Sequence, residues 1–185
     1  MSLFIVWLTL LFILFDAAKG ERRWDYEPLE FEGISSDHSK LGIDLGIKRI
    51  KRGEFAMDGV IDVKYDVDDT TMIEAIAWRS NTGDEDDYKL MPWCIEKQTF
   101  GKFIENYYES MVLKNIGHCT NFPAVDNVHP FPKNAYKLDM CEFTGEGLPE
   151  IAPEGYYKII FSATGEVDWS FMVKTKVVPK TDLYG

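Results

Sequence analysis

The stretch FAMDGVIDVKYDV, residues 55–67, alternates between two kinds of side chain. One side carries Phe55, Met57, Gly59, Ile61, Val63, Tyr65 and Val67, and the other carries Ala56, Asp58, Val60, Asp62, Lys64 and Asp66. A period of two sustained over a dozen residues predicts a half-buried antiparallel strand. The fold is therefore expected to be built around a sheet with one apolar face.

The neighbouring segments also favour strands. Asp68–Thr70 predicts a turn, and Met72–Ser80 is interpreted as the hairpin partner of the first strand. Upstream, apolar residues alternate again over 43–47. Trp24–Phe31 is a weaker strand that contains Pro28, which predicts an edge position because proline cannot donate to a sheet ladder.

The last third of the chain returns to the strand period. Strands are predicted over Tyr136–Phe143, over Tyr156–Ala163 and over Val167–Val177, with a short hairpin turn at Ala163–Glu166 between the last two. The acidic segment Ser80–Asp87 is interpreted as a solvated hairpin loop, because its spacing lacks the alternating ligands of an EF-hand.

One segment has the helical period instead. Apolar residues recur at intervals of three and four between Phe100 and Val112, which predicts an amphipathic helix over Thr99–Leu113 that stops before Gly117. Seven or so short strands with one helix predict a mainly β fold: an antiparallel β-sandwich or β-cup. Bulky residues on facing positions could hold the sheets apart and leave an apolar cavity.

The amino-acid composition argues against several classes of binding partner and against disorder. The 185 residues include 31 acidic and 20 basic side chains, a formal net charge of −11, and aromatic residues make up 14%. This balance argues against a nucleic-acid partner and against adsorption to an anionic membrane. The aromatic content excludes a wholly disordered chain. The length suits a single domain.

The first twenty residues are interpreted as a signal peptide. An apolar run, Leu3–Phe15, is followed by small residues at Ala18 and Gly20, as a signal-peptidase site requires. A retained anchor is the alternative, although the run is short for a bilayer span. We therefore expect a secreted, extracellular protein whose single domain spans residues 21–185, with no integral membrane span.

The sequence contains no recognisable catalytic motif, and we expect a non-enzyme with no cofactor and no metal. His118 beside Cys119 is better explained as a surface histidine next to a disulfide cysteine than as a catalytic couple. The chain has three cysteines, so an odd thiol remains over or joins an intermolecular bond.

The large side chains on the predicted inner faces are the candidate ligand-binding residues. They come from the helix and the last two long strands: Phe100, Phe103, Ile104, Tyr107, Tyr108, Tyr157, Ile159, Phe161, Trp169 and Phe171. The alternative for each is that it simply fills a solid core.

Several motifs resemble the insect CheA chemosensory proteins. They are HPFPKNAY at 129–136, then Cys141, GLPEIAPEGYYKIIF at 147–161 and GEVDW at 165–169. EKQTF at 96–100 and CTNFP at 119–123 fit the same pattern, so the resemblance covers most of the chain after residue 20. The CheA family is similar, more distantly, to the ganglioside activator protein, a lipid-binding cup.

The resemblance implies a β-cup with an apolar cavity and a helix near its rim, acting as a carrier of lipids or hydrophobic cues in taste and pheromone perception. In the activator-like pattern, a cysteine just before the helix pairs with one seven residues later. Here Cys94 is present, but the seventh place is Gly101. The resemblance therefore implies a Cys119–Cys141 disulfide and a free thiol at Cys94.

The leading hypothesis is a secreted, non-catalytic carrier of a hydrophobic ligand or lipid. Its acidic surface could also dock a receptor or a lipid-processing enzyme. The second hypothesis is an extracellular protein-interaction module with a solid core and no ligand, which would need a contiguous exposed apolar patch.

Overall fold

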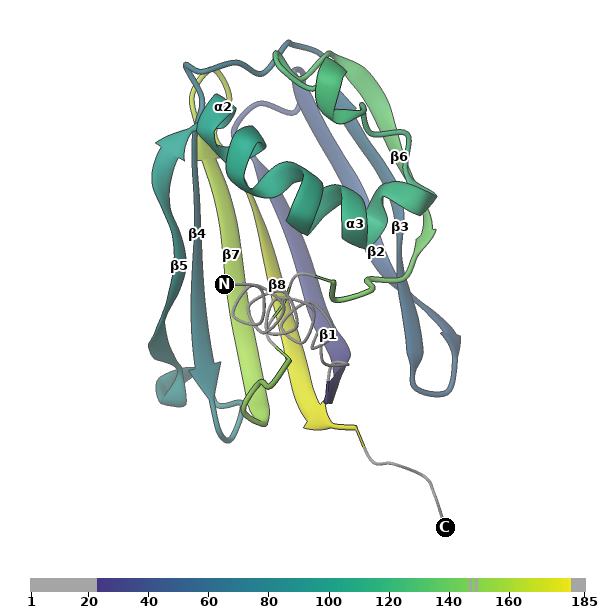
Figure 1. Cartoon of the computed structure of the whole chain (residues 1–185), viewed down its shortest axis with the longest axis vertical. Helices are drawn as coiled ribbons and strands as arrows, with labels where there is room; N and C mark the ends of the chain where they lie inside the picture. The colour runs from purple at the N-terminus through teal and green to yellow at the C-terminus, as the bar shows by residue number, and fades with distance from the viewer. Residues whose placement is uncertain (1–22, 147, 149, 181–185) are drawn as a thin grey trace, which may run out of the picture.

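The computed structural model describes residues 23–146, 148 and 150–180, so the predicted signal peptide, residues 1–20, lies outside the described residues. Eight strands form two antiparallel sheets (Figure 1). The strands are β1 (Trp24–Ser35), β2 (Leu41–Lys51), β3 (Glu54–Val63), β4 (Met72–Ser80), β5 (Lys89–Thr99), β6 (Asn134–Cys141), β7 (Gly155–Thr164) and β8 (Trp169–Pro179). The predicted mainly β, antiparallel sandwich-like fold is confirmed.

The larger sheet, sheet A, has the strand order β1-β8-β7-β4-β5, and the smaller one, sheet B, has the order β2-β3-β6. The two sheets come closest where β1 faces β2. A Cβ atom added at Gly33 in β1 would lie only 2.4 Å from Cγ2 of Ile43 in β2. Glycine at this position therefore lets one edge of sheet A approach sheet B, while the sheets diverge on the other side (Figure 1).

One predicted pairing is wrong. β3 and β4 do not form a hairpin, because β3 pairs with β2 and β6 while β4 pairs with β5 and β7 in the other sheet. The residues between them cross from sheet B to sheet A, and Val67 in this crossing exchanges two backbone hydrogen bonds with Phe131. Two amphipathic strands joined by a short turn suit either arrangement, so the alternation alone could not distinguish them.

The edge position predicted for the first strand is confirmed. β1 is an outer strand of sheet A and pairs only with β8. Its register shifts between Pro28 and Glu30, where proline lacks the N–H that a regular ladder needs.

The predicted helix is present but differs in length and winding. It runs through α2 (Phe100–Phe103), a π-helical stretch η2 (Ile104–Leu113) and α3 (Lys114–Ile116). It thus ends three residues beyond the predicted end, at Ile116, and its middle is wound with i→i+5 hydrogen bonds, such as Lys114 N–H to the Glu109 carbonyl. Short 3-10 turns are η1 (Glu85–Asp87), η3 (Gly117–Cys119) and η4 (Val125–Asn127).

At the start of the helix, two side-chain oxygen atoms accept hydrogen bonds from backbone N–H groups of the first turn. Thr99 Oγ1 accepts a hydrogen bond from the Lys102 N–H, and Asp69 Oδ1 accepts one from the Gly101 N–H at 2.7 Å. A Cβ at Gly101 would lie 2.6 Å from the same Asp69 oxygen. The glycine that replaces the expected cysteine therefore leaves room for a carboxylate at the helix N-terminus, where the macrodipole favours negative charge.

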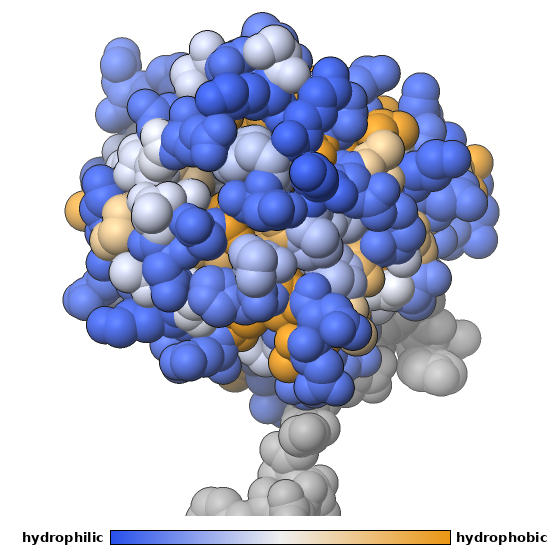
Figure 2. All heavy atoms as spheres, turned by 90° about the horizontal axis from the view of Figure 1, so that it is seen from above, coloured by the Kyte–Doolittle hydropathy of each residue, from blue (hydrophilic) through white to orange (hydrophobic). Residues whose placement is uncertain are grey.

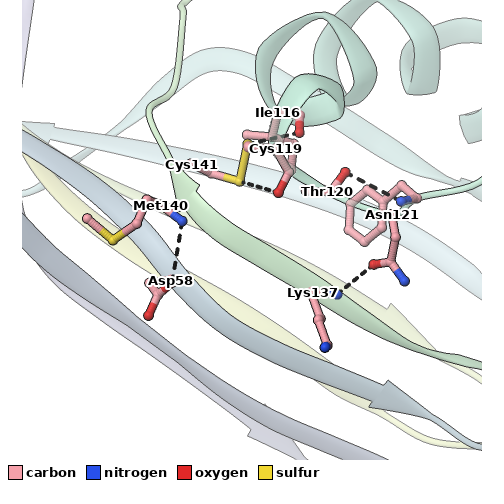
Figure 3. Close-up of a disulfide and its surroundings, with 9 residues drawn as sticks. Asp58, Ile116, Cys119, Thr120, Asn121, Lys137, Met140 and Cys141 are labelled. Atoms are coloured by element: carbon pink, nitrogen blue, oxygen red, sulfur yellow. Dashed lines mark hydrogen bonds between the residues drawn. A yellow bond between two sulfur atoms is a disulfide. The ribbon is translucent and has the colours of Figure 1, made fainter.

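The cysteine pairing implied by the family resemblance is confirmed. Cys119 and Cys141 form a disulfide with 5.4 Å between their Cα atoms, which ties the turn after the helix to the end of β6 (Figure 3). Asn121 Oδ1 accepts a hydrogen bond from the Lys137 N–H beside it, so hydrogen bonding as well as the disulfide joins the two segments. Cys94 is a free, exposed cysteine in β5.

Candidate functional site

The interior has a closed end beneath the helix. Its fully or almost fully buried side chains come from both sheets, the helix and the loop that follows it; among them are Ile73, Phe100, Phe103, Tyr108, Val128 and Tyr136. We call this group the closed end. Phe131 connects its parts, with ring centroids 6.1 Å from Phe100 and 4.7 Å from Tyr136. Because these aromatic rings pack tightly against one another, we assign the residues of the closed end to the core and not to a ligand site.

A row of aromatic rings leads out of the closed end along the inner face of sheet A. The centroid of Phe103 lies 5.3 Å from that of Phe161, Phe161 lies 5.8 Å from Trp169, and Trp169 lies 5.1 Å from Phe171. Phe171 in turn stacks on Phe31 of β1 at 5.9 Å. Unlike the closed end, Phe31, Phe161, Trp169 and Phe171 are each only partly buried.

The middle of the sandwich carries further half-buried apolar side chains on both inner faces. Register places Ile159 opposite Val173 on the same face as the Phe161–Phe171 pair, and Ile47 opposite Met57 in sheet B. We call the following residues the open half: Phe31, Ile159, Phe171 and Val173 from sheet A, and Leu45, Ile47 and Met57 from sheet B. These side chains face the space between the sheets and yet retain exposure.

The structure separates the sequence-predicted ligand residues into three groups. Phe100, Phe103, Ile104 and Tyr108 belong to the buried core, and Tyr107, Phe161 and Trp169 pack against it while partly exposed. Ile159 and Phe171 lie in the open half. Tyr157 joins neither group: it packs with Trp24 and Val177 in a separate cluster, and its hydroxyl donates to the Pro153 carbonyl.

Sequence reasoning missed the contribution of sheet B and of β1 to the open half. The alternation of Leu45, Ile47 and Met57 was visible, but nothing in it indicated that this face lies opposite the last two strands. Phe31 was placed in an edge strand whose partner, β8, was unknown. The missing information in each case was the strand order.

Two segments span the diverging side of the sandwich. The helix crosses in front of it from the end of β5, and the chain directly after β6, residues 142–146, runs below the helix (Figure 1). Asn115, which is 1% exposed, joins them. Its Nδ2 donates to the carbonyls of Met111 and Glu146, and its Oδ1 accepts from the Gly145 N–H at 2.7 Å.

The end of the molecule at which the helix begins is polar. Figure 2 looks down on this end and shows mostly hydrophilic residues, with hydrophobic ones visible in recesses between them. An open depression here is lined by Asp66, Asp68, Asp69, Thr70, His129 and Pro130. His129 Nε2 lies 3.4 Å from Asp69 Oδ2, and hydrogen bonds from Thr70 lower the pKa of Asp68.

In the acidic loop between β4 and β5, the Asp87 carboxylate forms hydrogen bonds with other groups of the same loop. Asp87 Oδ2 accepts hydrogen bonds from the Asn81 N–H and the Ser80 hydroxyl, and these bonds lower the pKa of the carboxyl group. Among the described residues, no group of three or more histidine, cysteine, aspartate or glutamate side chains is placed to hold a metal ion.

Burial changes the titration of the tyrosines at the closed end. Desolvation raises the pKa of Tyr136 to about 12 and raises that of Tyr108 further. Both hydroxyls are satisfied: Tyr108 donates to the Pro123 carbonyl at 2.7 Å, and Tyr136 donates to the Pro132 carbonyl. These tyrosines therefore stay neutral and serve as structural donors.

The outer face of sheet A carries an apolar row of its own. Ile76, Ile160 and Met172 are cross-strand neighbours on this face, and register places Cys94 of β5 beside Ile76. Trp78 lies next along β4, opposite Leu90, which is 66% exposed. This row is an apolar surface, apart from the open half, that is partly open to solvent.

Comparison with known proteins assigns no activity. Residues 73–159 match the family described as "Protein of unknown function (DUF1091)". The matched span runs from β4 into β7 and therefore contains the helix, the disulfide and β6. No curated protein matches the chain. In the part of the chain that the structure describes, no helix is long and apolar enough to cross a membrane.

Proposed function

We propose that this protein is a secreted, non-enzymatic carrier that holds a lipid or another hydrophobic small molecule between its two sheets. The observation that carries the proposal is the open half: apolar side chains from β1, β2, β3, β7 and β8 face one another across the sandwich, yet remain partly exposed. Residues in a solid sandwich core would be buried on both inner faces.

The energetic argument concerns the surface that remains exposed. Burying hydrocarbon is worth about 0.8 kcal/mol per methylene group, and a ligand in the open half would also cover the residual exposed area of its walls. An apolar chain of moderate length therefore gains enough to offset the loss of translational and rotational freedom. The helix and the chain after β6 would cover the part of the ligand that lies nearest the closed end.

The resemblance to the CheA proteins, and more distantly to the ganglioside activator protein, supports the same proposal. It adds a physiological setting, in which the bound molecule is a hydrophobic cue in taste or pheromone detection. It also suggests a receptor or a lipid-processing enzyme as a partner that receives the ligand. A secreted product would begin near Glu21, and N-terminal sequencing of protein from culture medium tests that cleavage.

The direct test is native mass spectrometry of the secreted protein, with organic extraction of whatever co-purifies. We expect a stoichiometric apolar adduct, or uptake of the fluorescent probe N-phenyl-naphthylamine by delipidated protein. A clean unliganded mass together with no uptake of the probe would contradict the carrier function.

A matched pair of variants locates the site. Ile159 faces the open half, whereas its neighbour Ile160 lies on the outer face of sheet A. Ile159→Trp should fill the open half and weaken probe binding at least about tenfold, equivalent to about 1.4 kcal/mol. Ile160→Trp adds the same bulk on the other face and should leave binding unchanged.

The outer apolar row favours a second candidate function, an extracellular protein-interaction module. Ile76, Ile160 and Met172, with the exposed Leu90 at the edge, form the kind of contiguous patch that such a module needs. If this candidate is correct, Ile160→Trp abolishes partner capture, Ile159→Trp does not, and no probe is taken up.

A further inference from the structure

Tyr65 has a buried hydroxyl that makes no hydrogen bond of regular length and angle. The residue follows β3, in the crossing between the sheets, and its side chain belongs to the main core with 8% exposure. Among the described residues, Tyr65 Oη is the one buried side-chain nitrogen or oxygen that has no hydrogen-bond partner. An unpaired buried hydroxyl costs about 1–3 kcal/mol, so its retention calls for a reason.

The neighbour of this hydroxyl is a residue of the aromatic row. The Trp169 indole lies beside the phenol, and a weak interaction of its N–H with the phenol oxygen opposes the rise in the Tyr65 pKa that burial causes, although the pair does not reach the distance and angle of a regular hydrogen bond. The ring of Trp169 lies 5.1 Å from that of Phe171, which belongs to the open half. The unpaired hydroxyl therefore stands at the inner end of the wall along which an apolar ligand would lie.

We propose that Tyr65 Oη and the Trp169 indole N–H form the polar anchor of the ligand site, and that the ligand is a long apolar chain ending in an uncharged oxygen acceptor, such as an ester, ketone or aldehyde. This inference rests on the proposed carrier function. A phenol can donate and an indole can only donate, so a single carbonyl oxygen satisfies both.

The charges around the anchor select against an anionic head group. The carboxylates of Glu166 and Asp168 lie on the turn before Trp169 and act on Tyr65 by raising its pKa further. The nearby cation, Lys40, is paired with Glu166 at 2.9 Å. A fatty-acid carboxylate would therefore meet repulsion without a counter-ion, whereas a neutral carbonyl would not.

The site opens through Trp169. Tyr65 Oη is completely covered by side chains, whereas Trp169 is only partly buried at the border of the open half. A shift of the indole ring lets a carbonyl oxygen reach both donors. The apolar chain of the ligand then extends past Phe171 and Ile159.

The test measures displacement of N-phenyl-naphthylamine by three compounds with equal numbers of carbons: tetradecyl acetate, hexadecane and hexadecanoate. For the wild-type protein we expect tetradecyl acetate to bind about tenfold tighter than either of the other two, as one or two net hydrogen bonds would give. In Tyr65→Phe this advantage over hexadecane should fall to about twofold or less, with hexadecane affinity unchanged.

Tyr108→Phe is the matched control, because Tyr108 is also a buried tyrosine but its hydroxyl already donates to the Pro123 carbonyl. This variant should keep the preference for the acetate and should unfold at a lower temperature. Tyr65→Phe should not unfold at a lower temperature, since it removes an unpaired hydroxyl. A lower unfolding temperature for Tyr65→Phe would mean that the hydroxyl is structural, which contradicts the anchor.

The outcomes separate the two proposals. If the probe itself does not bind, the carrier function fails, and the anchor fails with it. If the probe binds but the acetate has no advantage over hexadecane or hexadecanoate, or keeps its advantage in Tyr65→Phe, then only the anchor is wrong.

Discussion

The closed end and the open half share strands β2, β3 and β7, yet one is buried core and the other remains partly exposed. β7 contributes Ala163, which is 1% exposed, and four residues earlier Ile159, which is partly exposed on the same face. Strand period and side-chain type are the same at both positions. The difference comes from the helix and the loop after it, which pack over one end of the sandwich only. Burial in a two-sheet fold is thus set by what covers the diverging side.

The largest expected effect tests this contrast with two phenylalanines of the aromatic row. Phe103 is buried at the closed end and Phe171 is partly exposed in the open half. Phe103→Ala should lower the free energy of unfolding by about 3–5 kcal/mol, and Phe171→Ala by less than half of that. Urea denaturation measures both. Equal losses would mean that the open half is ordinary core.

The second-largest effect is expected for loss of the disulfide. This bond ties the turn after the helix to β6, and so it holds in place the helix and loop that cover the closed end. Replacing both Cys119 and Cys141 by serine should cost about 3 kcal/mol in the chain-entropy model. Cys94→Ser is the control: Cys94 is exposed and unpaired, and its replacement should change stability by no more than about 0.5 kcal/mol. Chemical denaturation under non-reducing conditions distinguishes the two.

A substitution at Asn115 tests whether the segment after β6 helps the helix to cover the sandwich. Asn115→Ala leaves the Gly145 N–H and the Glu146 carbonyl without their partner, and should lower stability by about 2 kcal/mol. We also expect faster release of bound N-phenyl-naphthylamine, measured by stopped-flow fluorescence. Loss of stability with an unchanged release rate would restrict the role of Asn115 to the fold.

The smallest expected effect concerns the start of the helix. Asp69→Ala removes the acceptor of the Gly101 N–H and should cost about 1 kcal/mol. Asp69→Asn keeps an oxygen acceptor at the same place and should lose less. If hydrogen exchange at the first turn of the helix is the same in both variants, the Asp69 side chain does not fix the beginning of the helix.

Predictions that rest on local periodicity were reliable. The alternation around Ile61, the strand Tyr156–Ala163 and the edge position of the Pro28 strand follow from which residues point to one face and which can donate to a ladder. The helix was recognised for the same reason. Its π-helical middle was not predicted, because residues such as Phe100, Ile104 and Tyr108, four apart, suit either winding.

Predictions that needed a partner far away in the chain were not reliable from residues alone. The β3–β4 hairpin failed because each strand found its partners in a different sheet. The disulfide was obtained from a family resemblance, since three cysteines allow more than one pairing. In the sequence, Tyr65 resembles any other inner-face residue of the strand predicted over 55–67, and only the tertiary structure shows that its hydroxyl has no regular hydrogen bond.

The sequence by itself determined that this is a mainly β protein with one helix, because side-chain alternation and helical spacing are properties of a few neighbouring residues. Tertiary structure alone decided which strands share a sheet, which apolar faces oppose each other and how deeply each is covered. Those properties depend on contacts such as Gly33 with Ile43, or Asn115 with Gly145. No pattern of neighbouring residues predicts that these pairs are in contact.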